Sequence, residues 1–349
     1  MIFPPFLKEA GVIGVTAPSF GATTEPYITR FSKAKKNFLE RGYSVVEGKT
    51  CFKNDGIGIS TNPHDAAKEL VDFYSDSSLD AVISCGGGEL MCETISEVDF
   101  EKISTLPPKW FMGYSDNTNF IFPLVTQYET AAIYGQNFTG FGKKWERAEL
   151  EAESLLRGTN FLVKGYSHFQ SPDVSENENV YILNQKSTRK AYTVKNGKLS
   201  QLSEDESLSF DGILVGGCLD VLSNLCGTRF DSVKEFNKKY DKVIWVLEAC
   251  DLSILDIRRA FWHLQESHWF KNASGFVIGR PLASYNQNCM GLDRFSALKE
   301  PLEKCNVPVI FDADIGHIDP IMPIIMGSFA NVLFSKDDFS INMKTTIHL

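Results

Sequence analysis

Three side chains at the ends of predicted strands have the types that a hydrolase uses for nucleophilic catalysis. Ser115 follows the apolar run "WFMGY", Glu248 ends "VIWVLE", and His317 lies in "DADIGHIDP". A hydroxyl, an imidazole and a carboxylate can form a triad in which the imidazole takes the hydroxyl proton and the carboxylate orients the imidazole. Their order in the chain, Ser, Glu, His at three separate strand ends, is compatible with such a triad.

Ser115 has two interpretations. Serine is a common N-cap residue, and Asp116 and Asn117 after it are typical of a helix start. In the other interpretation Ser115 lies on a nucleophile elbow, a sharp turn that lifts the hydroxyl clear of the sheet and directs the following N–H groups to the same point. Only half of the G-x-S-x-G pattern is present, because Asn117 stands in place of the second glycine.

Glu248 and His317 also have structural alternatives. A carboxylate at the end of an apolar strand needs a partner, and Arg258 or Arg259 could provide it in an ion pair. A histidine in a loop such as that of His317 is often simply solvated. The glycines of "SCGGGE", residues 84–89, offer unobstructed backbone N–H groups that could stabilise an oxyanion, or they form only a tight turn. This loop lacks the patterns of a P-loop and of a dinucleotide site.

Cys85 is an alternative nucleophile, since a thiol after a strand and beside glycines could pair with His317 and Glu248. Its position at the end of an apolar run favours buried packing. A second alternative is a divalent metal site that uses clustered carboxylates and an imidazole, from Asp312, Asp314, His317 and Asp319. A third is a two-domain binding protein that closes on a small molecule without turnover. We favour the serine triad, and we expect no metal and no cofactor.

The elements that must position these residues alternate in the first half of the chain between β-branched runs and helix-period segments. A helix is predicted over 27–41, and another after Asn62; apolar strands end at "SCGGG" and "MGYS". Phe31, Ala34, Phe38 and Leu39 are predicted to form the apolar face of the first helix. This alternation predicts an α/β fold with a parallel, doubly wound sheet whose ligands bind at the carboxyl ends of the strands.

The composition changes from about residue 161 onward. "NVYILNQ" and "KAYTVKNGKLSQL" have the pattern of strands, the second with an Asn196-Gly197 hairpin turn. Beyond them, "GILVGGCLDVLSNLCGT" predicts a strand, a glycine turn and a helix, and a helix is expected over about 253–268. We therefore predict an N-terminal α/β domain over 1–165, which carries Ser115, and a second mixed α/β domain with several strands over 166–349.

Composition limits the classes of partner. The 349 residues carry a net charge of -9, with a pI near 5.3, and 43% are hydrophobic. This charge argues against nucleic acid and membrane partners, which need clustered Lys and Arg. The eight cysteines form no CxxC pair, and no leader or long apolar run is evident. We expect a cytoplasmic protein with reduced cysteines that acts on a small molecule.

Several ordered blocks give the sequence a resemblance to the LD-carboxypeptidase family of serine peptidases, which includes murein tetrapeptide carboxypeptidases and microcin C immunity peptidases. These blocks extend over most of the chain: "GVIGVTAPS", the glycine loop at 86–88, "FMGYSDNT", "GILVGGCLDVLSNLCGT", "VLEACD", "DIRRAFWHL", "GFVIGRP" and "PVIFDADIGH". The long stretch between Ser115 and Glu248 looks more like the microcin-immunity branch than the shorter murein enzymes. The glycine loop departs from the family at Gly88 and Glu89, which leaves its substrate contacts open.

The resemblance implies a catalytic triad of Ser115, Glu248 and His317. It also implies an oxyanion hole made by backbone N–H groups of the glycine loop, at Gly87 or Gly88, and of Asp116. The family further implies a catalytic cleft between two domains, and commonly a homodimer. The expected substrate is a small peptide or an aminoacyl-amide, either of the microcin type or a murein tetrapeptide.

Overall fold

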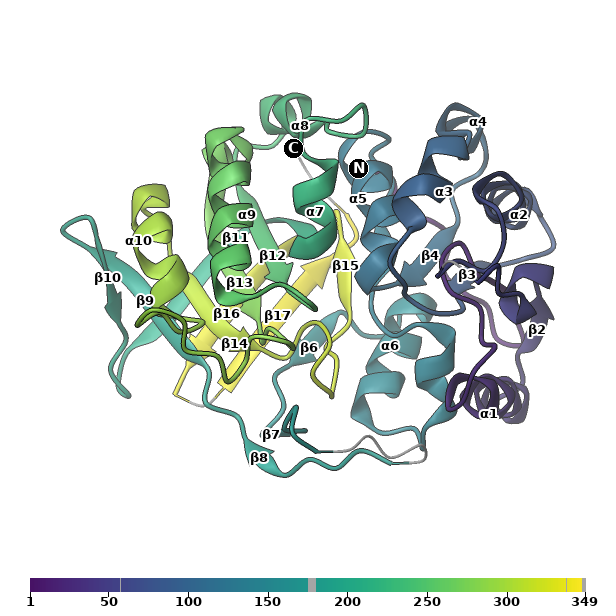
Figure 1. Ribbon diagram of the computed structural model, residues 1–349, viewed down its shortest axis with the longest axis horizontal. Coiled ribbons are helices and arrows are strands. Elements are labelled where there is room, and N and C mark those ends of the chain that lie inside the picture. Colours follow the sequence, from purple (N-terminus) through teal and green to yellow (C-terminus); the bar gives the residue numbers. More distant parts are fainter. Residues whose placement is uncertain (57, 175–179, 337, 347–349) are drawn as a thin grey trace. The chain divides into compact units, whose positions relative to one another are not determined.

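The computed structural model of the protein describes residues 1–56, 58–174, 180–336 and 338–346 (Figure 1). The chain forms two units. The first holds Met1–Asn160, Pro323–Ile325 and a short stretch that ends at Tyr181; the second holds most of the remaining chain, including Ile182–Met322. The sequence-based boundary at 165/166 stays a prediction.

The first unit contains a six-stranded sheet in the order β15-β5-β4-β3-β1-β2. The strands β1 to β5 are joined in parallel pairs, and the strand order reverses between β1 and β3. This confirms the predicted parallel sheet, and it places a topological switch point, where ligands usually bind in such folds, at the carboxyl ends of β1 and β3. The strands are β1 (Val12–Thr16), β2 (Ser44–Glu47), β3 (Ala81–Ser84), β4 (Trp110–Gly113), β5 (Ala132–Tyr134) and β15 (Ile324–Met326).

The helices of the first unit follow the predicted periodicity, with one exception. Phe31, Ala34 and Phe38 are buried on α1, whereas Leu39 is 51% exposed, so its predicted place on the apolar face is wrong. Leu39 follows Phe38 by one residue, which turns its side chain about 100° away around the helix. Asn62 caps α2 as predicted, since its side chain accepts the Asp65 N–H at 3.0 Å. The helices are α1 (Tyr27–Glu40), α2 (Pro63–Ser75), α3 (Met91–Glu97), α4 (Phe100–Thr105), α5 (Thr118–Thr126) and α6 (Arg147–Arg157), with 3₁₀ turns η1 (Lys49–Phe52), η2 (Ser115–Asn117) and η3 (Phe138–Gly142).

The second unit contains a nine-stranded mixed sheet in the order β10-β9-β14-β13-β12-β11-β16-β17-β6. Its centre, β11 to β14, is parallel, and antiparallel strands flank it on both sides. This confirms the mixed α/β architecture predicted for the second half of the chain. The strands are β6 (Leu162–Lys164), β9 (Lys190–Lys195), β10 (Lys198–Gln201), β11 (Ser207–Cys218), β12 (Val243–Glu248), β13 (Ala273–Gly279), β14 (Val309–Ala313), β16 (Phe329–Ser335) and β17 (Asp338–Lys344); β7 (His168–Phe169) and β8 (Gln185–Lys186) form a separate pair.

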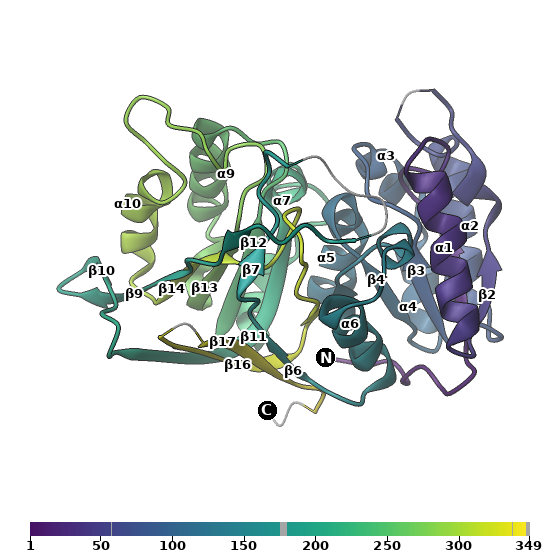
Figure 2. The same cartoon turned by 90° about the horizontal axis from the view of Figure 1, so that it is seen from below.

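Two local predictions for the second half of the chain were wrong, and one is confirmed. The glycines of "LVGGC" form no turn, because β11 continues through them to Cys218; a Cβ on Gly216 would lie 1.9 Å from the Val246 carbonyl oxygen. Of "NVYILNQ", Asn179 lies outside the described residues, and only Gln185 belongs to a strand. The predicted hairpin at 196–197 joins β9 to β10, and it forms the outer edge of the sheet in Figure 2.

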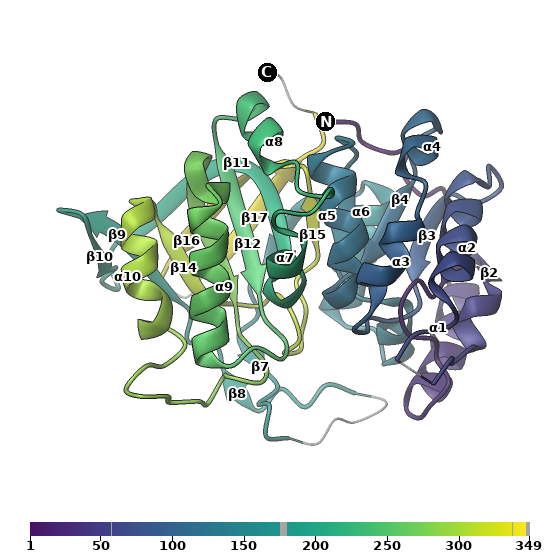
Figure 3. The same ribbon diagram turned by 45° about the horizontal axis from the view of Figure 1, so that its top comes forward.

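Helices α7 (Leu219–Leu225), α9 (Ile254–Glu266) and α10 (Ser296–Cys305) lie side by side over the second sheet, and α8 (Val233–Lys239) and η4 (Trp269–Asn272) complete the unit (Figure 3). Aromatic side chains fill the layer between α9 and the sheet: Trp245 stacks on Trp269, and Phe261 contacts Phe276. Each fully buried side chain of this size contributes roughly 1.5–3 kcal/mol.

Among the residues that the structure describes, none of the helices has the length and apolar character of a membrane span.

Candidate active site

Ser115 lies on a strained turn between β4 and α5. Tyr114 is extended, whereas Ser115 has φ +64°, a left-handed conformation that is uncommon for a residue with a side chain. Its backbone N–H donates to the Tyr134 hydroxyl at 3.1 Å. A left-handed residue directly after a parallel strand is compatible with the nucleophile-elbow interpretation of Ser115.

The glycine loop after β3 approaches Ser115 closely. A Cβ on Gly87 would lie 3.1 Å from the Ser115 Cβ and 3.2 Å from its Oγ, so a side chain at this position would crowd the hydroxyl. Gly88 has φ +150°, and a Cβ there would lie 2.0 Å from the Ser19 Oγ. Position 88 therefore needs glycine, both for its backbone conformation and for space, whereas a side chain at position 87 would require Ser115 to shift by a few tenths of an ångström.

Asp116 and Asn117 fasten the Ser115 turn to its surroundings. The buried Asp116 carboxylate accepts hydrogen bonds from the Ser19 hydroxyl at 2.5 Å and the Met91 N–H at 2.9 Å. Burial raises the pKa of Asp116, and these hydrogen bonds counteract part of that effect. The Asn117 amide donates to the Gly86 carbonyl at 2.9 Å, which links the glycine loop to the turn. Asn117, which stands in place of the second glycine of the elbow motif, thus connects the Ser115 turn to the glycine loop.

Glu248 and His317 form a buried hydrogen-bonded pair in the second unit. Glu248 ends β12, and His317 lies in the loop after β14. The His317 Nδ1–H donates to the Glu248 Oε2 at 2.8 Å, with the carboxyl side chain fully buried and the imidazole 11% exposed. A carboxylate on Nδ1 fixes the tautomer in which Nε2 can accept a proton.

Two glycines make room for this pair. Gly316 has φ +103°, and a Cβ there would lie 2.4 Å from the Glu248 Oε2. A Cβ on Gly279 would lie 3.0 Å from the Glu248 Cβ and 2.2 Å from the Ile315 carbonyl oxygen. The close approach of the backbone on both sides excludes water from the carboxylate and holds it against the imidazole.

Opposing effects act on the pKa of His317. Burial disfavours the imidazolium and lowers the pKa, whereas the Glu248 charge and the hydrogen bonds that the ring makes with Cys250 and Glu248 raise it; the net result is a pKa well above the usual 6.5. Burial raises the pKa of the Cys250 thiol, and His317 counteracts part of this rise. The carboxylate therefore makes the imidazole a stronger base than a solvated histidine.

The residues invoked in the alternative interpretations have other partners in the structure. Arg258 pairs with Glu300 at 2.8 Å and Arg259 pairs with Asp256, so neither provides the ion pair expected for Glu248 in that interpretation. Cys85 is fully buried, and its thiol contacts that of Cys51.

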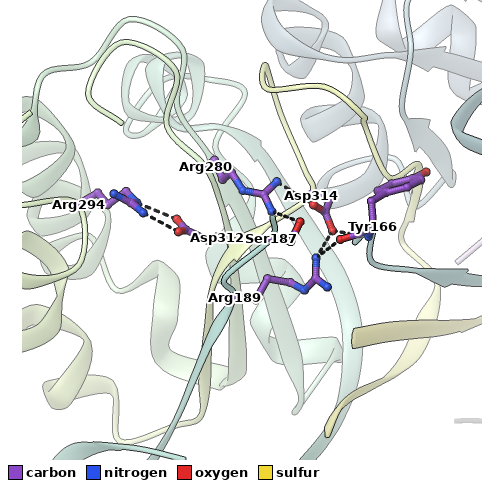
Figure 4. Close-up of polar contacts among 7 residues, drawn as sticks. All are labelled: Tyr166, Ser187, Arg189, Arg280, Arg294, Asp312 and Asp314. Carbon is purple, nitrogen blue, oxygen red and sulfur yellow. Dashed lines mark hydrogen bonds and ion pairs between the residues drawn. The ribbon is translucent and has the colours of Figure 1, made fainter. Parts of the chain in front are cut away.

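Two of the three carboxylates of the alternative metal site, Asp312 and Asp314, are bound by arginines. Asp312 pairs with Arg294, and Asp314 pairs with Arg189 and Arg280 (Figure 4). Across residues 1–56, 58–174, 180–336 and 338–346, no group of three or more His, Cys, Asp or Glu side chains could hold a metal ion.

The structure thus brings the predicted residues together in two groups: Ser115 with Gly87, Gly88 and Asp116 in the first unit, and Glu248 with His317 in the second. Sequence reasoning missed residues that support these groups: Ser19, Tyr134, Asn137 and Cys250. The sequence contained a signal that could have identified them: each lies at or shortly after the carboxyl end of a strand, where polar residues are expected to face a ligand site.

Comparisons with known proteins agree with this organisation. The models of the LD-carboxypeptidase N-terminal and C-terminal domains match residues 13–135 and 211–332, which together are more than half of the chain. No curated protein matches the sequence.

Among solved structures, an MccF-like protein from Bacillus anthracis str. Ames is 20% identical with a TM-score of 0.75, over 99% of this chain and all of that one. The microcin C7 self immunity protein MccF in complex with aspartyl sulfamoyl adenosine is 20% identical with a TM-score of 0.78, over 99% and 100% of the two chains. A muramoyltetrapeptide carboxypeptidase from Oxalobacter formigenes is 16% identical with a TM-score of 0.70, over 97% and 100%.

These similarities confirm the predicted fold and its likeness to the microcin-immunity branch. With both domain models matched in order along the chain, the protein belongs to the LD-carboxypeptidase family and is a serine-type peptidase.

Proposed function

We propose that the protein hydrolyses an amide bond through a triad of Ser115, His317 and Glu248. The observation that carries this proposal is the hydrogen bond between the buried Glu248 carboxylate and Nδ1 of His317, at 2.8 Å. It leaves Nε2 as the basic nitrogen of a strengthened base. The strained Ser115 turn, in contact with a glycine loop, supports the second half of the proposal.

In the proposed reaction His317 takes the Ser115 proton while the hydroxyl oxygen attacks the amide carbonyl. Glu248 stabilises the imidazolium that forms, and the imidazolium then donates its proton to the leaving amine as the C–N bond breaks. Water, activated by the same imidazole, attacks the acyl-enzyme ester and releases the carboxylic acid, which regenerates the Ser115 hydroxyl. Every proton is returned, so no cofactor is needed.

The proposed oxyanion hole consists of the Asp116 N–H and the N–H of Gly87 or Gly88. Asp116 lies in the first turn of η2, whose leading N–H groups have no acceptor within a 3₁₀ turn. The glycine loop is held in place from both sides, because the Gly87 carbonyl accepts the Phe20 N–H at 3.0 Å and the Gly86 carbonyl accepts the Asn117 amide. One such donor is typically worth about 10²- to 10³-fold in rate.

We propose that the substrate is a small aminoacyl-amide, as in microcin C immunity. MccF structures carry aspartyl sulfamoyl adenosine and glutamyl sulfamoyl guanosine, and their TM-scores of 0.77–0.78 support this choice over a murein tetrapeptide. The similarity to a muramoyltetrapeptide carboxypeptidase, at a TM-score of 0.70, makes cell-wall peptide recycling the second candidate. A binding protein without turnover is the candidate of a different class.

Incubation of the protein with an aminoacyl adenylate amide and, separately, with a murein tetrapeptide, followed by mass spectrometry of the products, tests the proposal. We expect cleavage of the aminoacyl-amide and no cleavage by Ser115→Ala. Cleavage of the tetrapeptide alone would support the second candidate. An intact pool of both compounds with wild-type protein, while the compounds still bind, would support the binding protein.

We also propose that the protein is a cytoplasmic homodimer, as the family resemblance implies. The charge of -9 supports a free protein without a nucleic acid partner. Sedimentation of the purified protein would show a species of twice the 39.1 kDa chain mass; a monomer over the whole concentration range would contradict the dimer.

A further inference from the structure

A buried carboxylate lies three residues before His317, at the start of the loop that carries it. Asp314 follows β14, and its side chain is 0% exposed. Arg280 donates to its Oδ1 at 2.7 Å, and Arg189 and the backbone N–H of Tyr166 donate to its Oδ2 at 2.7 and 2.9 Å. Figure 4 shows the two guanidinium groups reaching the carboxylate from different segments of the chain.

Arg280 is as deeply buried as its partner. It follows β13 directly, and its side chain is 1% exposed. Its second terminal nitrogen donates to the Ser187 hydroxyl at 3.1 Å, and the guanidinium lies 4.1 Å from the centre of the Phe169 ring. A cation so far from water needs its counter-ion, which makes the Arg280–Asp314 geometry rigid.

Asp314 also closes the His317 loop through its backbone. The Asp314 carbonyl accepts the Met322 N–H at 2.7 Å, so both ends of the loop meet at Asp314. Next to it, the Ile315 carbonyl oxygen lies 2.2 Å from the position that a Cβ of Gly279 would take. The end of β13 and the first turn of the loop therefore lie close together at Gly279 and Ile315, which are the chain neighbours of Arg280 and Asp314.

We propose that Asp314, clamped by Arg280, is a positioning residue for the reaction. The clamp fixes the first turn of the loop, and through it the His317 imidazole keeps Nδ1 on the Glu248 carboxylate. This inference rests on the proposed function in treating His317 as the base. If Asp314 contributed only to stability, its loss would affect catalysis no more than the loss of another buried ion-pair residue in this unit.

The unit supplies a matched control in Asp312. Arg294 holds it in a two-pronged ion pair at 2.9 and 2.8 Å, and Asp312 is also buried. In Figure 4 this pair lies apart from the Asp314 cluster. Asp312→Asn removes the same charge as Asp314→Asn from the same strand end, but it leaves the clamp on the His317 loop intact.

The test compares these two variants by proton NMR of the unliganded protein and by steady-state kinetics. The readout is the downfield resonance of the His317 Nδ1–H, identified by its absence in His317→Ala. We expect the resonance to persist in Asp312→Asn and to be lost in Asp314→Asn, with kcat reduced about 10²-fold and KM nearly unchanged, because a misplacement of about 1 Å costs this much. Arg280→Gln should behave like Asp314→Asn, and Arg280→Lys should recover much of the loss.

An unchanged resonance in Asp314→Asn, or equal kcat losses in Asp314→Asn and Asp312→Asn at equal folded fraction, would overturn the inference. If Asp314→Asn does not fold, the same two readouts, the His317 Nδ1–H resonance and kcat, are measured on Arg280→Gln instead. Failure of the proposed function gives a different result: His317→Ala would keep wild-type hydrolysis, while the resonance would still report whether the clamp positions the ring.

Discussion

Gly316→Ala probes the geometry of the Glu248–His317 pair most sharply. The new Cβ would lie 2.4 Å from the Glu248 Oε2, which is 1.0 Å closer than the 3.4 Å at which ordinary contact begins. The carboxylate would have to move by about that distance, and displacements of about 1 Å cost about 10²-fold in rate. The φ of +103° adds about 1–3 kcal/mol of strain for any residue with a side chain.

Gly227→Ala separates the two effects. Gly227 lies in the same unit with φ +80°, and a Cβ there meets no atom within 4 Å, so this variant carries the strain without the collision. In urea unfolding we expect a loss of about 1–2 kcal/mol for Gly227→Ala and a further loss of about 1–3 kcal/mol for Gly316→Ala from overpacking. Only Gly316→Ala should lose kcat against the aminoacyl-amide. Equal stability and equal kcat in the two variants would refute the reasoning.

Three further predictions concern the nucleophile, the base and metal ions. Ser115→Ala should abolish hydrolysis in a mass-spectrometric assay, whereas Cys85→Ala should keep it; the opposite pattern would make the buried thiol the nucleophile. Glu248→Gln should lower kcat by about 10³- to 10⁴-fold. Because the Glu248 charge raises the pKa of His317, its removal should also move the acidic limb of the kcat/KM profile to lower pH; a limb that stays in place would contradict this origin of the shift. Overnight dialysis against a chelator should leave the rate unchanged, and a loss restored by a divalent ion would favour the metal alternative.

Local patterns in the sequence predicted much of the scaffold. Hydrophobic periodicity located α1 and the parallel strands, and the residue type of Asn62 located the start of α2, because these signals depend on residues near one another in the chain. The same reasoning failed at Gly216 and Gly217. Glycine pairs favour turns, but here the neighbouring strand β12 approaches Gly216 so closely that only glycine fits at that position of β11.

The partners of the charged residues could not be predicted from local patterns. Arg258 and Arg259 are near Glu248 in sequence, yet they point to acids on the helices. Asp314 is bound by Arg189, which is 125 residues away, a pairing that only the sheet order creates. The positive φ of Ser115 likewise follows from the tertiary contacts of Gly87 and Tyr134 with its turn.

The central claim is that His317 activates the Ser115 hydroxyl, and labelling by a fluorophosphonate tests it most directly. Peptide mass spectrometry should locate the phosphonyl adduct on Ser115 in the wild-type protein, and His317→Ala should slow its formation by at least about 10²-fold, the lower range for general base catalysis. An adduct elsewhere, or equal labelling of Ser115 in both proteins, would contradict the claim.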